Sequence, residues 1–265
     1  MKIAIAVGLV VASLGGTAAS QAATTDASPP SAQAQAMIDK AQAAIDAAGP
    51  AAKEAFVVET GKAILYPIRN PDNVSVIHKA TGMVCGVSAD SQLTIKVYRQ
   101  DTRGHAIDVS CDMVLRNTSQ TLYAFQQPGS SVAKELDRAS LAITTLHQDA
   151  VLQDKSPLDS FEDMNRFLSL RDYETIKDTV ARAYIRPSPD PRGLYESAWV
   201  GKQGDWFILQ RSTGPAYWNW MAGALWHDVW RNMLPDMAAE ETAQINALVD
   251  ARQKAERESQ SSSSK

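Results

Sequence analysis

Hydrophobic and polar positions alternate in two separate stretches of the chain, and helical spacing appears before, between and after them. The alternation runs over short segments between 56 and 127 and returns between 179 and 211. A period of two is typical of strands with one buried face, and spacing of three and four residues is typical of amphipathic helices. This order predicts an α+β domain, because strands and helices would alternate steadily in a parallel α/β fold. We expect an antiparallel sheet covered by helices, similar to an α-β-α sandwich, with an extra C-terminal helix.

The element boundaries follow from turn and cap residues. Helical spacing predicts helices at 35–48, 131–151 and 215–233, and a cap residue followed by proline begins another at 156. Alternation predicts strands at 63–68, 74–78, 93–99, 107–115 and 122–125, and then a three-stranded meander at 180–185, 194–200 and 206–211. The helix at 131–151 carries a stripe expected to face the core, formed by Val132, Leu136, Ala139, Ile143, Leu146 and Ala150.

The N-terminal pattern is that of a secretory signal peptide. Lys2 precedes an apolar run over 3–14, which is shorter than the about 20 residues that cross a bilayer. Ser20 and Ala22 are small residues at the positions that a signal peptidase reads. We therefore expect cleavage near Ala22, a periplasmic or secreted protein, and no membrane span after cleavage. The expected organisation is a signal peptide at 1–22, a flexible leader at 23–34, one α+β domain at 35–258 and a disordered tail at 259–265.

The later part of the chain resembles a known group of proteins. Its hairpin reads Ser197, Ala198, Trp199, Val200, then Gly204, Asp205, Trp206, Phe207, Ile208, Leu209, Gln210, Arg211, and then Thr213, Gly214 and Pro215. With two strand blocks separated by a long helix, this order resembles exported proteins of the PsbP-like and DcrB-like kind over about 57–233. The resemblance implies an α-β-α sandwich and a non-enzymatic accessory or binding role, and it includes no catalytic motif. The extra C-terminal helix departs from the pattern of that group.

The chain contains two cysteines, Cys85 and Cys111. In an exported chain such a pair predicts one disulfide, and alternation places both on the apolar side of their strands. Two unpaired core thiols are the alternative. The outer strands of a three-stranded meander lie about 10 Å apart, whereas a disulfide needs Cα atoms within about 7 Å. The strand at 93–99 should therefore not lie between the cysteines, and the Cys85 segment should pair beside the Cys111 strand or cross its end.

Charge and motifs limit the chemistry. The formal net charge is −4 and no basic run occurs, so nucleic-acid binding is not expected. Phosphate loops and nucleophile motifs are missing from the sequence, and we predict no catalytic residue and no cofactor. The histidines are scattered, so we predict surface histidines and no metal site. Asp108 and Asp112 flank Cys111 on the opposite strand face; they could hold a cation, but a solvated sheet face is expected.

All six tryptophans fall between Trp199 and Trp230. Most are expected in the core, with a groove for sugar rings or a peptide as the alternative. On the predicted helix at 215–233, the core face gathers Trp218, Met221, Ala222, Leu225, Trp226, Val229 and Met233. Trp220 falls outside that face together with His227 and Arg231, and these three are the candidate binding residues unless the last helix covers Trp220.

The sequence thus favours an exported, non-enzymatic accessory or binding protein. An envelope protein is the preferred partner, ahead of a small ligand or a glycan. The alternative is a hydrolase of envelope polymers that uses carboxylates brought together by folding.

Overall fold

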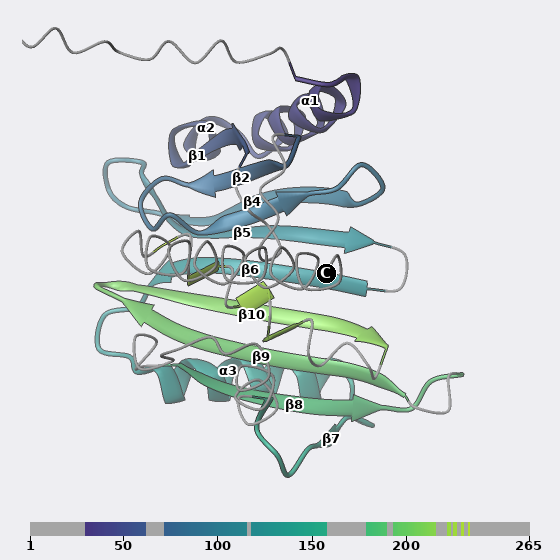
Figure 1. Cartoon of the computed structure of the whole chain (residues 1–265). Coiled ribbons are helices and arrows are strands. Elements are labelled where there is room, and N and C mark those ends of the chain that lie inside the picture. Colours follow the sequence, from purple (N-terminus) through teal and green to yellow (C-terminus); the bar gives the residue numbers. More distant parts are fainter. Residues whose placement is uncertain are drawn as a thin grey trace, which may run out of the picture.

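The computed structural model describes residues 30–61, 72–115, 118–157, 179–189 and 193–215, together with Ala222, Gly223, Leu225, Trp226, Val229, Trp230 and Met233. These residues form a mixed α+β fold with two antiparallel sheets (Figure 1). The helices are α1 (Ala32–Ala47), α2 (Pro50–Ala55) and α3 (Val132–Leu146). The α+β prediction is confirmed at this level.

The smaller sheet has the order β1-β2-β3, and the larger has the order β4-β5-β6-β10-β9-β8-β7. The strands of the smaller sheet are β1 (Phe56–Thr60), β2 (Val74–His78) and β3 (Val84–Val87). The larger sheet contains β4 (Gln92–Gln100), β5 (Ala106–Leu115), β6 (Thr118–Gln126), β7 (Val151–Leu152), β8 (Val180–Arg186), β9 (Leu194–Gln203) and β10 (Trp206–Pro215). The two strand blocks of the sequence meet where β6 pairs with β10, and the predicted meander of the last three long strands is confirmed.

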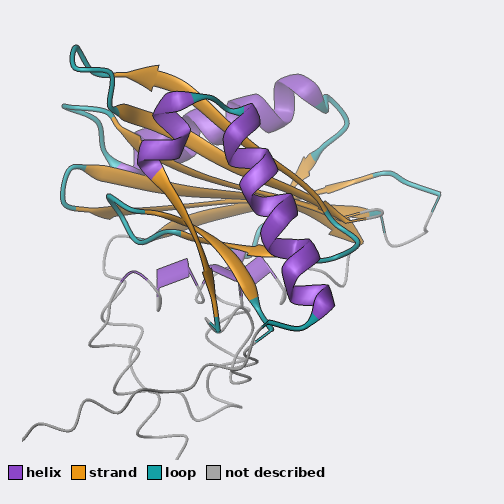
Figure 2. Ribbon diagram, turned by 90° about the horizontal axis from the view of Figure 1, so that it is seen from above, coloured by secondary structure: helices purple, strands orange, loops and turns teal. Residues whose placement is uncertain are grey.

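The larger sheet packs differently at its two ends. On β4–β6, one face carries Ile95, Val109, Cys111 and Leu122, which pack with the smaller sheet and with α1. On β8–β10, the same face meets Trp226, Val229, Trp230 and Met233, whereas the opposite face packs against α3 through Leu136, Ala139 and Ile143. Figure 2 shows α1 and α2 over one edge of the sheets and α3 to one side.

Local sequence explains the helix ends. Ser31 caps α1 by accepting a hydrogen bond from the Ala34 amide, and Ser131 caps α3 through the Lys134 amide. Gly49 has a φ of 92°, which glycine adopts without strain, and the chain then turns into α2 with proline at its first position. The predicted first helix is confirmed with a shifted start, and α2 was not predicted.

Several expectations were wrong. The strands before residue 127 divide between two sheets, whereas a single sheet was expected. Helix α3 ends at Leu146, which is 66% exposed and not part of the core, and Val151 begins a short strand. Gly214 and Pro215 end β10, where a helix start was predicted. The predicted strand at 63–68 lies outside the described residues, as does the helix predicted after Pro157.

In the part of the chain that the structure describes, no helix is long and apolar enough to span a membrane.

Candidate binding face

The candidate residues chosen from the sequence, Trp220, His227 and Arg231, lie outside the described residues. Five positions on the neighbouring predicted core face are described: Ala222, Trp226, Val229 and Met233 are buried, and Leu225 is half-buried. Trp230, which was not assigned to that face, is also buried. Burial of the predicted face is confirmed at four of its five described positions, and the binding role of the three candidates stays a prediction.

The described tryptophans mostly belong to the core. Trp199 on β9 lies 6.2 Å from Trp226 between ring centroids, and Trp226 lies 5.6 Å from Trp230 in an edge-to-face arrangement. All three are at most 4% exposed. They therefore pack the sheet and do not line a groove for a ligand.

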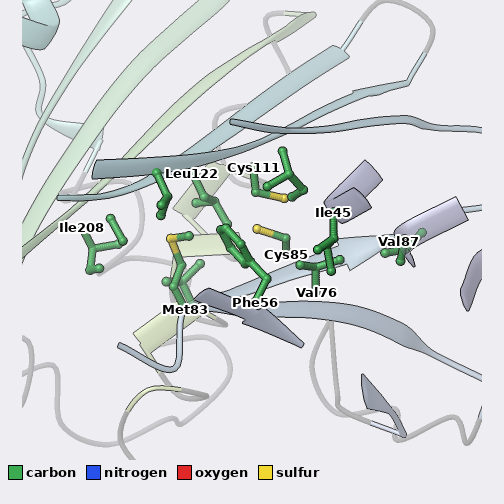
Figure 3. Packing of buried hydrophobic residues seen from close by; sticks show 14 of the residues in the cluster. Ile45, Phe56, Val76, Met83, Cys85, Val87, Cys111, Leu122 and Ile208 are labelled. Carbon is green, nitrogen blue, oxygen red and sulfur yellow. The ribbon is translucent and has the colours of Figure 1, made fainter. Parts of the chain in front are cut away.

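Cys85 on β3 and Cys111 on β5 lie side by side in the core, with their sulfur atoms toward each other (Figure 3). Both are free thiols in this structure. As expected, β4 does not lie between them, but β3 does not pair beside β5. The two strands belong to different sheets, whose buried residues share one hydrophobic cluster. Burial raises the pKa of the Cys111 thiol, and the adjacent Cys85 raises it further.

The expectation of surface histidines was wrong for His78, which is 1% exposed. Its ring lies between Phe56 and Trp206, and its Nδ1 is 2.9 Å from the Thr81 hydroxyl. Burial lowers the pKa of His78 to about 4, so the ring is neutral at pH 7. Among the described residues, no three histidine, cysteine or acidic side chains gather in a way that could hold a metal ion.

The face of β4–β6 that lies opposite Cys111 carries polar and aromatic side chains, with Ser110 buried and Tyr123 half-buried among them. Cross-strand pairing places Lys96, Ser110 and Tyr123 in one row, and Asp112, Thr121 and Arg211 in the next. We call this surface the tyrosine face and define it by Lys96, Tyr98, Ser110, Asp112, Tyr123 and Arg211. Tyr98 is 50% exposed, in contrast to the tryptophans.

A β-bulge aims Tyr98 onto this face. The register between β4 and β5 shifts between Val97 and Arg99, which leaves Tyr98 without a cross-strand partner on β5. A bulge of this kind redirects a side chain. The Tyr98 ring then stacks on Tyr123 across β5, with ring centroids 6.3 Å apart, and its hydroxyl lies 3.3 Å from Ser110 Oγ.

Two ion pairs neutralise the acidic residues beside the tyrosines. Lys96 Nζ lies 2.6 Å from Asp112 Oδ2, and Arg99 Nε lies 3.1 Å from Asp108 Oδ2. Both aspartates thus have a basic partner from β4, which removes the basis for the cation site considered from the sequence. Burial raises the pKa of Asp108, although Arg99 acts in the opposite direction.

Arg211 is the remaining charged group of the tyrosine face. It lies opposite Thr121, and none of the described carboxylates forms an ion pair with its guanidinium. Burial raises the pKa of the adjacent Tyr123 hydroxyl, and the positive charge of Arg211 partly opposes this shift. The face therefore combines a stacked tyrosine pair with a cation that no carboxylate of the described residues neutralises.

A second polar cluster lies beneath the end of α3. Glu196 on β9 is 2% exposed; its Oε1 forms an ion pair with Arg186 at 3.0 Å and lies 3.4 Å from His147 Nε2. This carboxylate is held between two bases, whereas, among the described residues, Asp137 pairs with Arg182 alone and Glu135 with Arg138 alone. The described ion pairs thus join acids to bases, and they do not bring two carboxylates together for acid-base catalysis.

Comparison of the chain with known family models, with curated proteins and with solved structures finds no match. The tyrosine face was not identified from the sequence. Its strands were predicted, but the stack depends on a bulge at Tyr98 and on the pairing of β5 with β6. The position of Arg211 depends on the pairing of β10 with β6. None of these has a sequence signal. The pattern of residues did place Asp108 and Asp112 on the face opposite Cys111, as found.

Proposed function

We propose that the protein is an exported, non-enzymatic binding protein and that the tyrosine face is its ligand-binding surface. The observation that carries this proposal is the stacked, half-exposed Tyr98 beside Tyr123, next to Arg211, which forms no ion pair with a carboxylate of the described residues. Tyrosine and arginine are enriched among the residues that dominate binding energy at interfaces. A rigid aromatic pair also loses little conformational entropy when a partner binds.

The contrast between the two ends of the larger sheet supports this position of the ligand-binding surface. The strands β8–β10 have hydrophobic packing on both faces, from α3 on one side and from Trp226 and Trp230 on the other. The strands β4–β6 have such packing on the face that carries Cys111. On the opposite face, Tyr123 and Phe125 of β6 still pack against the cluster around α3, whereas Lys96, Tyr98 and Arg99 of β4 are exposed. A ligand would thus meet a flat surface already held in place by the core behind it.

We favour a protein partner over a glycan. Lys96 and Asp112 neutralise each other, so Arg211 is left to attract a negative group. A partner that offers a carboxylate to Arg211 and an apolar side chain to Tyr98 would fit both features. A glycan that carries an acidic group is the alternative ligand for the same surface.

The proposed periplasmic or secreted location of the protein rests on the N-terminal sequence pattern, with removal of residues 1–22 during export.

The finer architecture is part of the proposal as well. A helix built from the segment that contains Trp226 and Trp230 would oppose α3 across the sheet and complete an α-β-α sandwich, as in the PsbP-like and DcrB-like proteins that the sequence resembles.

Site-specific photocrosslinking tests the proposed surface. A benzophenone side chain in place of Tyr98 should give one covalent adduct with an envelope component, because that position would lie within the interface. The matched control places the same group at Leu141 on α3, which is 66% exposed. Adducts that are the same from both positions would contradict the proposal, and digestion of the adduct with protease or glycosidase distinguishes a protein from a glycan.

The hydrolase alternative has less support. It requires two carboxylates, or a carboxylate and a nucleophile, that converge on one substrate atom. In the described part of the chain, the buried acid Glu196 is compensated by Arg186 and His147. Hydrolysis of envelope polymers that is lost in Glu196→Gln would revive this alternative.

A further inference from the structure

Cys85 and Cys111 occupy the contact between the two sheets. Cys85 comes from an edge strand of the smaller sheet, and Cys111 comes from the second strand of the larger sheet. Both are 0% exposed, and Figure 3 shows them with Phe56, Val76 and Leu122 around them. A bond between them would tie the smaller sheet directly to the face of the larger one.

The burial of both sulfur atoms limits when such a bond can form. Thiol–disulfide exchange needs a thiolate that attacks a disulfide sulfur in line, so the oxidant must touch the protein sulfur. In the folded protein neither sulfur reaches the surface, and burial also disfavours the thiolate of Cys111. Access therefore requires that the two sheets are apart.

We propose that Cys85 and Cys111 form a disulfide during folding, before the smaller sheet packs on the larger one, and that the folded protein then keeps whichever redox state it acquired. The oxidant is a low-molecular-weight or protein disulfide. One cysteine thiolate attacks it and releases the first thiol, and the second cysteine then attacks the mixed disulfide and releases the second thiol. Two electrons and the two thiol protons pass to the oxidant. This proposal concerns the core and is independent of the binding function.

The test compares two starting states in the same buffer of oxidised glutathione. One sample is the reduced chain diluted from denaturant, and the other is the reduced protein that has already folded. At intervals both are quenched with acid, unfolded and labelled with a maleimide polymer, which shifts the gel mobility for each free thiol. A control variant, Cys85→Ala/Cys111→Ala/Leu141→Cys, carries one exposed thiol and reports that the oxidant reacts with folded protein.

The refolding chain should give an intramolecular disulfide with no free thiols. The folded reduced protein should keep both thiols and oxidise at least about a hundredfold more slowly, while the control reacts readily. Equal oxidation rates from the two starting states would overturn the proposed order of events. Two free thiols after refolding, or a stable mixed disulfide with glutathione, would overturn the proposed bond.

Discussion

The indole ring of Trp230 packs directly on the backbone of Gly201. A Cβ atom at position 201 would lie 2.3 Å from Cζ2 of Trp230 and 3.2 Å from Cζ2 of Trp226. No real side chain tolerates the shorter contact, so this point of β9 requires glycine for the tryptophans to close over the sheet. The relationship ties Trp230 to β9 of the larger sheet.

Substitution Gly201→Ala should therefore destabilise the protein by about 1–3 kcal/mol, as expected for an overpacked core. Equilibrium denaturation in urea measures the change. In a Trp230→Leu background, Gly201→Ala should lower the free energy of unfolding by less, because the indole ring that the new Cβ would contact is absent. Equal costs in the two backgrounds would show that Trp230 does not pack on β9.

A buried amide chain makes a second connection between the sheet and the C-terminal residues. Gln120 Nε2 donates to Gln210 Oε1 at 2.9 Å, and Gln210 Nε2 donates to the Ala222 carbonyl at 2.7 Å. Substitution Gln210→Leu leaves both partners buried and unpaired, at a cost of about 1–3 kcal/mol each. Gln120→Leu should cost less, because Gln210 keeps its bond to Ala222. Thermal melts of the two variants compare their losses of stability. A larger loss for Gln120→Leu than for Gln210→Leu would contradict the hydrogen bonds described.

The buried His78 predicts a dependence of stability on acid. Its pKa is about 4 in the folded protein and about 6.5 in an unfolded chain, so the unfolded state binds a proton first as the pH falls. This histidine therefore lowers the free energy of unfolding progressively between pH 6.5 and pH 4, by about 3 kcal/mol in total. Above pH 6.5 it makes no such contribution.

Urea denaturation at several pH values between 7 and 4 measures this effect. The variant His78→Asn keeps an amide near the Thr81 hydroxyl but has no titrating ring. It should be less stable at pH 7 and should lack the histidine part of the acid dependence. A variant with the same loss of stability toward pH 4 as the natural chain would show that His78 is not the group responsible.

The sequence predicts elements well where a single packed face defines them. Helix α1 shows its stripe through Met37, Ala41 and Ile45, and β5 shows Val109 and Cys111 on one side, so both were found near their true positions. Leu146 fits the helical spacing of α3 but is exposed, because the helix ends there. Spacing alone does not reveal where a helix leaves the sheet.

The arrangement of strands and the candidate site depend on contacts between distant residues. Val76 and Val109 both lie in segments with the alternation of a strand, and nothing in the local pattern of either assigns them to different sheets. The stack of Tyr98 on Tyr123 likewise requires the bulge in β4 and the pairing of β5 with β6. Such features arise from tertiary packing, which the period of the sequence does not encode.

Measurement of partner affinity in surface variants tests the central proposal most directly. With the component crosslinked at position 98 as the probe, Tyr98→Ala and Arg211→Ala should each weaken binding at least about tenfold, a loss of about 1.4 kcal/mol. The control variant Leu141→Ala should bind like the natural chain, and melting curves should show that all three remain folded. Affinities for Tyr98→Ala and Arg211→Ala equal to that of the natural protein would contradict binding through the tyrosine face.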